Sequence, residues 1–328
     1  MYEKPFHRID LSNFVFLITG GAGFIGSNLV EYLLKYNAKE VRVFDNLSTG
    51  FAKNLKAFET AKNFKFIEGD IGDYSQCLEA TKGVDYISHQ AALGSVPRSI
   101  EFPIDTNKAN VDGFVNMATA ARENNVKRMV YASSSSVYGD SAELPKEESK
   151  IGNPLSPYAV SKYVNELYAK VFYNNYGQEL IGLRYFNVFG PRQSPEGEYA
   201  AVIPLFIEAL KNNQSPIING DGKQSRDFTF VENAVQANIK ALFTEKEDAF
   251  GKAFNVAVGE KYNLLELVEF LQKIIGNTTP PIHRADRAGD IRHSWASISK
   301  AQKLLNYKPM IQFENGLKIT VQWFGSES

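Results

Sequence analysis

A tyrosine and a lysine four residues apart form the pair of side chains in this sequence that is best suited to acid–base chemistry. Tyr158 and Lys162 stand in the stretch Tyr-Ala-Val-Ser-Lys, which opens a predicted helix soon after Asn153-Pro154. Residues i and i+4 share a helix face, so the phenol and the ammonium can point into one cleft. The ammonium would stabilise a phenolate and lower the pKa of Tyr158, which makes this residue an acid–base group near neutral pH. Of the 16 tyrosines, only Tyr158 has a lysine four residues later.

The chain around this pair alternates short apolar runs with amphipathic segments. The apolar runs predict strands at Phe14–Thr19, Val41–Phe44, Lys65–Glu68, Tyr86–His89, Arg128–Ser133 and Leu180–Arg184. Helical patterns lie at Ile25–Tyr36, Tyr74–Thr81, Thr106–Asn124 and Tyr158–Tyr176, and a final helix is expected near Ser297–Leu305. This alternation predicts an α/β fold with a doubly wound parallel sheet over residues 1–188. A smaller α/β substrate-binding domain is expected over residues 189–328, with part of 225–260 packing back on the first domain.

The first predicted strand runs directly into a glycine-rich turn and a helix. Gly20, Gly23 and Gly26 in Gly-Gly-Ala-Gly-Phe-Ile-Gly satisfy a dinucleotide-binding pattern. Glycine lets the turn close and lets the backbone approach a pyrophosphate, while the helix N-terminus offers free N–H groups and a positive dipole. The motif therefore predicts a Rossmann fold with a bound dinucleotide. The residues of this turn expected to touch it are Gly20, Gly23, Phe24 and Ile25.

An acidic residue at the end of the second predicted strand selects the type of dinucleotide. Asp45 lies nineteen residues after Gly26. Its carboxylate can accept hydrogen bonds from both ribose hydroxyls and would repel a 2′-phosphate, so NAD is favoured over NADP. The neighbours expected to line the same site are Asn46, Ser48, Thr49 and Gly50 in the next turn, and Asp70 and Ile71 after the third strand.

Composition and charge argue against several kinds of partner. The 328 residues are 44% hydrophobic and carry a formal net charge of −1, so no basic field favours nucleic acid or an acidic membrane surface. No apolar stretch approaches the ~18 residues needed to cross a bilayer, and the first residues do not form a signal peptide. Cys77, the only cysteine, cannot form an internal disulfide, which fits a reducing compartment. The four histidines show no metal-ligand spacing, so we expect a cytoplasmic protein without a metal site.

Four consecutive serines, Ser133 to Ser136, followed by Val-Tyr-Gly, complete a set of motifs that resembles a known family. Together with the glycine turn and the Tyr158/Lys162 pair, they resemble the extended short-chain dehydrogenase/reductase family, specifically its nucleotide-sugar epimerases. The likeness covers nearly the whole chain. It implies tightly bound NAD, a UDP-sugar substrate and a homodimer formed through the helices near residues 106–124 and 158–176.

The resemblance assigns unequal roles to the serines. In the family the catalytic hydroxyl lies four residues before the tyrosine of the Val-Tyr-Gly segment, which is Ser134 here, and Ser135 would contact the bound sugar or cofactor. Related sugar-nucleotide 4,6-dehydratases have Thr-Asp-Glu at the positions of Ser134, Ser135 and Ser136. The related UDP-glucuronate decarboxylases typically carry a glutamate in place of Ser136. Because neither Ser135 nor Ser136 is a carboxylate, both reactions lose support. The resemblance then implies reversible oxidation at C4 of the sugar, catalysed by Ser134, Tyr158 and Lys162.

The resemblance also implies further contacts on both ligands. Cofactor contacts are expected at Gln90, Ala91, Ala92, Asn110 and Tyr185, besides Tyr158 and Lys162. Substrate contacts are expected at Gly94, Ser95, Ser134, Ser135, Tyr158, Asn187, Ala201, Val202, Asn219, Arg226, Arg287, Asp290 and Ser294. The guanidiniums of Arg226 and Arg287 would bind the diphosphate with charge-assisted hydrogen bonds.

The residue four positions after Asp290 bears on the choice of substrate. Family members restricted to glucose and galactose carry tyrosine there, whereas this chain carries Ser294. A small side chain leaves room for an acetamido group. The expected reaction is therefore the interconversion of UDP-N-acetylglucosamine and UDP-N-acetylgalactosamine. A UDP-glucose/UDP-galactose or UDP-hexuronate 4-epimerase is an alternative, and an inactive NAD-binding regulatory protein is a further one.

Overall fold

A seven-stranded parallel sheet forms the centre of the molecule. The structure is a computed structural model that describes residues 1–196, 200–285 and 292–326. The sheet contains β1 (Val15–Thr19), β2 (Glu40–Asp45), β3 (Phe64–Glu68), β4 (Tyr86–His89), β5 (Arg128–Ser134), β6 (Leu180–Tyr185) and β11 (Lys252–Val256), in the order β11-β6-β5-β4-β1-β2-β3. The order reverses between β1 and β4, as in a dinucleotide-binding doubly wound sheet. The prediction of a doubly wound parallel sheet is confirmed.

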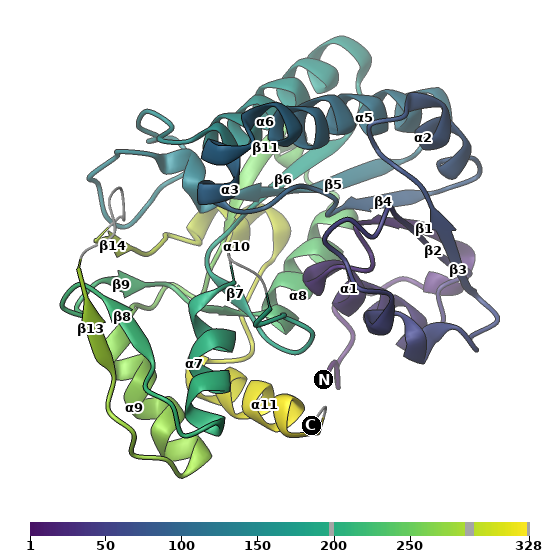
Figure 1. Cartoon of the computed structure of the whole chain (residues 1–328). Coiled ribbons are helices and arrows are strands. Elements are labelled where there is room, and N and C mark those ends of the chain that lie inside the picture. Colours follow the sequence, from purple (N-terminus) through teal and green to yellow (C-terminus); the bar gives the residue numbers. More distant parts are fainter. Residues whose placement is uncertain (197–199, 286–291, 327–328) are drawn as a thin grey trace.

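Helices cover both faces of this sheet (Figure 1). On one face lie α2 (Tyr74–Ala80), α3 (Val96–Glu101), α4 (Pro103–Asn107), a π-helical turn (Lys108–Asp112), α5 (Gly113–Glu123) and α6 (Pro157–Tyr176). On the other lie α1 (Phe24–Lys35), α8 (Val231–Leu242) and α10 (Ser299–Leu305). Alternate residues of β1 enter the two resulting cores: Phe16 and Ile18 join the α1 and α8 side, while Leu17 joins the α2 and α5 side. A strand buried on both faces needs a continuous apolar run, which explains the Val-Phe-Leu-Ile sequence.

The C-terminal part packs around a third core. It contains α7 (Val202–Lys211), α9 (Leu264–Ile275) and α11 (Phe313–Ser326). Short strand pairs connect these helices: β7 (Val188–Phe189) with β10 (Thr229–Phe230), β8 (Ile217–Asn219) with β13 (Ile282–Arg284), and β9 (Ser225–Arg226) with β12 (Tyr262–Asn263) and β14 (His293–Ser294). Phenylalanine rings at Phe189, Phe228, Phe230 and Phe313 contact one another in this core.

The chain returns from the C-terminal part to the central sheet. Helix α8 packs on α1, and β11 adds a parallel strand beside β6. Residues 231–256 therefore lie in the layers of the first half of the chain, although they follow residue 188 in the sequence. The division into domains at residues 188 and 189 stays a prediction.

Two predicted helices differ from the structure. The segment Thr106–Asn124 is not one regular helix, because the π-helical turn at Lys108–Asp112 separates α4 from α5. The helix predicted near Ser297–Leu305 is present as α10, but it is not the last helix, because α11 follows it. Gly316 weakens the helical pattern of α11 in the sequence. Packing explains this glycine, since an added Cβ would lie 2.9 Å from atoms of Phe189 and Phe230. Within the described residues, no helix has the length and apolar character that a membrane span requires.

Candidate active site

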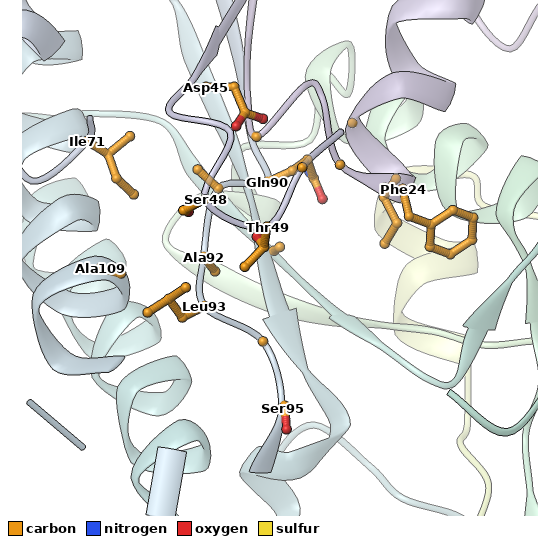
Figure 2. A pocket seen from close by; sticks show the side chains of 18 of the residues that line it. Phe24, Asp45, Ser48, Thr49, Ile71, Gln90, Ala92, Leu93, Ser95 and Ala109 are labelled. Carbon is orange, nitrogen blue, oxygen red and sulfur yellow. The ribbon is translucent and has the colours of Figure 1, made fainter. Parts of the chain in front are cut away.

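A cavity of about 1060 Å³ lies at the carboxyl ends of the parallel strands, where a doubly wound sheet binds its ligands. The glycine turn after β1, the ends of β2, β4 and β5, and the start of α6 all contribute to its lining. Figure 2 shows Asp45 at one end of the labelled residues and Ser95 at the other, with Ala92 and Leu93 between them. This volume is at the upper end of the range for small-molecule sites, ~300–1,000 Å³.

The glycine turn brings its backbone close to the backbone that follows β4. Gly20 has a φ of +65°, and a Cβ at this position would lie 2.6 Å from the Ala91 nitrogen. A Cβ on Gly26 would lie 2.2 Å from the Gly20 carbonyl oxygen. Glycine is therefore required at both positions, and the first turn of α1 lines the cavity with its N-terminus.

The acidic group at the end of β2 is held in place by backbone amides. The Asp45 carboxylate accepts hydrogen bonds from the amide of Ala22 at 2.9 Å and from the amide of Leu47 at 2.8 Å. Each carboxylate oxygen has a second lone pair that can accept a ligand hydroxyl. The side chains next to it on the cavity wall, at residues 46–50, carry no positive charge.

The structure gathers nearly all the expected cofactor residues around the cavity. Those that line it are Gly20, Gly23, Phe24, Ile25, Asp45, Asn46, Ser48, Thr49, Gly50, Asp70, Ile71, Gln90, Ala91, Ala92, Tyr158, Lys162 and Tyr185. Asn110 does not line it. The Asn110 side chain is buried in the π-helical turn. Its oxygen accepts a hydrogen bond from the Leu93 amide, and its nitrogen donates to the Leu93 carbonyl oxygen and to the Ser161 hydroxyl. It therefore holds the lining segment after β4 instead of facing the cavity.

Ser134 and Tyr158 face the cavity where β5 ends and α6 begins. Both residues line the cavity, together with Lys162. The Ser134 Oγ accepts hydrogen bonds from the amide and the hydroxyl of Ser136, at 3.1 and 3.0 Å. With its lone pairs used in this way, the hydroxyl of Ser134 has its own proton left to stabilise a phenolate at Tyr158, which lowers the pKa of that phenol. Ser136 is thus a hydrogen-bond partner of Ser134.

Burial dominates the titration of the tyrosine–lysine pair. It raises the pKa of Tyr158, and the hydrogen bond from Ser134 partly offsets this rise. It lowers the pKa of Lys162 to about 8. The Lys162 Nζ donates to the carbonyl oxygen of Ala132 at 2.9 Å and lies 5.8 Å from the centre of the Tyr158 ring. Burial therefore sets the direction of the Tyr158 pKa in the protein alone, and the expected lowering by Lys162 together with a cationic nicotinamide stays a prediction.

A closed set of hydrogen bonds fixes the amide of Gln90 on the cavity wall. Tyr185 donates its hydroxyl proton to the Gln90 Oε1 at 3.1 Å, while the Gln90 Nε2 donates to Ser88 and to Asn238. The Asn238 Nδ2 in turn donates to the Tyr185 hydroxyl at 2.7 Å. Asn238 is fully buried on α8. Sequence reasoning missed it because it lies far along the chain and carries no motif.

The expected substrate residues divide into two groups. Those that line the cavity are Gly94, Ser95, Ser134, Ser135, Tyr158, Asn187 and Ala201. Those that do not are Val202, Asn219, Arg226 and Ser294, while Arg287 and Asp290 lie outside the described residues. Arg226 donates to the backbone carbonyls of Ser225 and Arg292, and β9 and β14 place it beside the buried Ser294.

Several residues of the lining were not predicted. They include Leu93, Asp105, Lys108, Ala109, Asp112, Ala132, Ser133 and Val188. Lys108 and Asp112 are four residues apart in the helical stretch that contains Asn110, so helical spacing could have revealed this face. Within the described residues, no group of three or more His, Cys, Asp or Glu side chains is placed to hold a metal ion.

Comparisons with known proteins agree with this geometry. Residues 16–257 match the model of the NAD dependent epimerase/dehydratase family. A UDP-N-acetylglucosamine 4-epimerase from Methanobrevibacter ruminantium M1, solved with UDP-N-acetylmuramic acid, is 40% identical with a TM-score of 0.91, covering 96% of this chain and 99% of its own. The UDP-glucose 4-epimerase from Thermus thermophilus, solved with NAD, is 33% identical with a TM-score of 0.85 over 96% and 100%. A UDP-glucose 4-epimerase from Mycolicibacterium smegmatis is 37% identical over 314 residues, 95% of this chain and 99% of the relative.

Proposed function

The chain belongs to the NAD dependent epimerase/dehydratase family and is an NAD-dependent UDP-sugar 4-epimerase, and we propose that its substrates are UDP-N-acetylglucosamine and UDP-N-acetylgalactosamine. The observation that carries the proposal is that Ser134, Tyr158 and Lys162 share the wall of the dinucleotide-sized cavity. A reaction at a secondary alcohol needs a proton acceptor of this kind beside a hydride acceptor.

The residues of the cavity fit NAD. A bare glycine backbone, the N-terminus of α1 and the Asp45 carboxylate provide the surfaces that a pyrophosphate and an adenine ribose need. The turn at residues 46–50 offers no positive charge to a 2′-phosphate, which supports NAD over NADP. When bound, NAD supplies the position that takes a hydride from C4 of the sugar and later returns it.

The proposed role of Tyr158 is to take the proton from the sugar O4 hydroxyl and to return it after the sugar has turned over. The hydrogen bond from Ser134 stabilises the phenolate that forms. Burial raises the Tyr158 pKa, so positive charge near the phenol is needed to bring it toward neutral pH. Lys162 is the side chain placed to add that charge, four residues along the same helix face.

The residues that follow Ser134 support epimerisation over the related eliminations. Ser135 lines the cavity with a hydroxyl, and Ser136 uses its hydroxyl on Ser134. Neither position provides the carboxylic acid or carboxylate that loss of water would require. Oxidation at C4 and reduction from the other face would need the hydride acceptor that NAD supplies and a proton acceptor such as Tyr158, but no further carboxylate.

The N-acetylated substrate is supported by Ser294 and by the 40% identical epimerase named for UDP-N-acetylglucosamine. Ser294 has a small buried side chain on β14, beside Arg226 of β9. Ser294 does not line the cavity, so its proposed role of leaving room for an acetamido group rests on the family resemblance. The 37% identical UDP-glucose 4-epimerase supports UDP-glucose as the second candidate substrate.

Turnover of three substrates side by side tests the proposal. We expect the purified protein to act faster on UDP-N-acetylglucosamine than on UDP-glucose and UDP-glucuronate. The variant Ser294→Tyr should lose activity on the acetamido sugar by at least tenfold while keeping activity on UDP-glucose. An equal loss on both sugars would remove Ser294 from the account, and a wild-type preference for UDP-glucose would replace the proposed substrate.

A further inference from the structure

We infer that the buried ion pair of Glu166 and Arg184 is a positioning device for the reaction, because it fixes Ser134 against Tyr158 through Ser133. This inference rests on the proposed function, because Glu166 and Arg184 would position the hydroxyls of Ser134 and Tyr158 that the proposed reaction uses. Neither Glu166 nor Arg184 lines the cavity, so both act through their neighbours.

Helix α6 carries three functional side chains on one face. Tyr158, Lys162 and Glu166 follow at intervals of four residues, so they lie along one side of the helix. Lys162 and Glu166 hydrogen-bond the end of β5. The Lys162 Nζ donates to the Ala132 carbonyl oxygen at 2.9 Å, and the Ser133 hydroxyl donates to the Glu166 Oε1 at 2.6 Å. Two consecutive residues of β5, directly before Ser134, are thus bonded to the helix that carries Tyr158.

Arg184 holds the Glu166 carboxylate in the orientation that Ser133 requires. Its Nε donates to the Oε1 at 2.9 Å and its terminal nitrogen to the Oε2 at 2.7 Å, a bidentate pair. The side chains of Arg184 and Glu166 are only 4% and 9% exposed. Ser133 and Arg184 are register partners on the parallel strands β5 and β6. One rigid unit therefore joins two strands to the helix.

The same arginine also contacts the turn that follows Ser134. Its guanidinium carbon lies 4.9 Å from the centre of the Tyr138 ring, and another of its nitrogens donates to the Glu148 carbonyl oxygen. Tyr138 ends the 3-10 helix Ser135–Tyr138 and donates its hydroxyl proton to the Asn255 side chain at 2.7 Å. The chain is consequently fixed on both sides of Ser134 by contacts that lead to one buried charge pair.

Stability alone does not explain an ion pair at this place. Two charges taken out of water cost about as much in desolvation as their attraction returns, and apolar replacements of such pairs are often neutral or stabilising. What the pair provides is geometry, because a bidentate contact between an arginine and a carboxylate tolerates little movement. A hydrogen bond from Ser134 to the phenolate strengthens or weakens with such movement.

Two variants and one control separate positioning from mere stability. Ser133→Ala removes only the hydroxyl that joins β5 to Glu166, and Glu166→Gln removes the charge while nearly keeping the shape. The control, Thr320→Val, removes a buried hydroxyl that donates to the Gly316 carbonyl oxygen in α11, far along the chain from the cavity residues. For each holoprotein we would measure the melting temperature, kcat and KM, and the ionisation of Tyr158. That ionisation is followed without substrate by the absorbance of tyrosinate. The signal of Tyr158 is the difference between each protein and the same protein that also carries Tyr158→Phe.

We expect kcat to fall about five- to tenfold for Ser133→Ala, the equivalent of the ~1 kcal/mol of one hydrogen bond. For Glu166→Gln the fall should be larger, with KM changing less than twofold in both. The pKa of Tyr158 should rise in both variants, because the hydrogen bond from Ser134 that lowers it is weakened. Thr320→Val should change only the melting temperature.

An unshifted Tyr158 ionisation in Ser133→Ala, or a kcat equal to that of Thr320→Val, would overturn the inference. A rise in KM at constant kcat would overturn it as well. If Glu166→Gln does not fold, Ser133→Ala decides alone. If the wild-type protein converts no UDP-sugar, the proposed function fails, while the ionisation of Tyr158 still tests whether the ion pair places Ser134.

Discussion

Adding one methyl group at Gly20 should destroy the cofactor site, and the structure allows the effect to be calculated. Gly20 stands in the left-handed region with a φ of +65°, which costs an L-residue roughly 1–2 kcal/mol. The Cβ of Gly20→Ala would also lie 2.6 Å from the Ala91 nitrogen and 2.8 Å from its Cα. Overpacking of this kind typically costs roughly 1–3 kcal/mol. The two contributions together lower the free energy of unfolding by roughly 2–5 kcal/mol.

A second glycine isolates the backbone contribution. Gly83 has nearly the same φ, +68°, but an added Cβ there meets nothing within 4 Å. Gly83→Ala should therefore cost only the roughly 1–2 kcal/mol of the left-handed conformation. The difference between the two variants measures the close approach of the glycine turn to Ala91.

The assays are thermal unfolding and the NAD content of the purified protein. Ala91 and Ala92 line the cavity, so moving the Ala91 backbone should also remove bound NAD. We expect Gly83→Ala to retain NAD and Gly20→Ala to lose it. Full NAD content in Gly20→Ala, with a melting temperature equal to that of Gly83→Ala, would refute the reasoning.

Two further predictions concern the buried lysine and an exposed helix face. Because burial lowers the pKa of Lys162 from 10.5 to about 8, the unfolded state binds more protons between pH 8 and 10.5, and the full cost of the buried charge is present below pH 8. The cost of the buried charge is ~3 kcal/mol. Replacing Lys162 removes this cost but also removes the hydrogen bond to Ala132, which contributes ~1 kcal/mol. Without NAD, Lys162→Met should therefore be more stable than the wild type by about 2 kcal/mol at pH 7. The gain should vanish above pH 10.5 in denaturant titrations, and a loss of stability at pH 7 would contradict it. Leu167 and Val171 are about half exposed on α6, on the face where we predict the homodimer, so Leu167→Arg should yield monomers in light scattering while a dimeric variant would point to another interface.

The parts of the molecule that the sequence predicts are those with local causes. The glycine turn at Gly20 and the acid at Asp45 follow from strand ends, which apolar runs reveal, and the structure places both on the cavity wall. Tyr158 and Lys162 are one helical turn apart, so their common face needs no knowledge of the rest of the fold. These features carry most of the candidate site.

The features that escaped prediction depend on contacts between distant segments. Asn238 reaches Gln90 only because α8 returns to the central sheet. The Glu166–Arg184 pair joins a helix to a strand, and neither residue has a local pattern that reveals its partner. The rise that burial causes in the pKa of Tyr158 also escaped prediction, because burial depends on the packing of the whole fold.

The most direct test of the account is a nuclear magnetic resonance assay of the purified protein with UDP-N-acetylglucosamine and no added NAD. The account predicts that UDP-N-acetylgalactosamine appears until equilibrium, because the cofactor is held by the protein and recycled in each turnover. Tyr158→Phe, with the same NAD content, should show at least a hundredfold slower conversion. No conversion by wild-type protein that carries NAD, or equal conversion by Tyr158→Phe, would contradict the central claim.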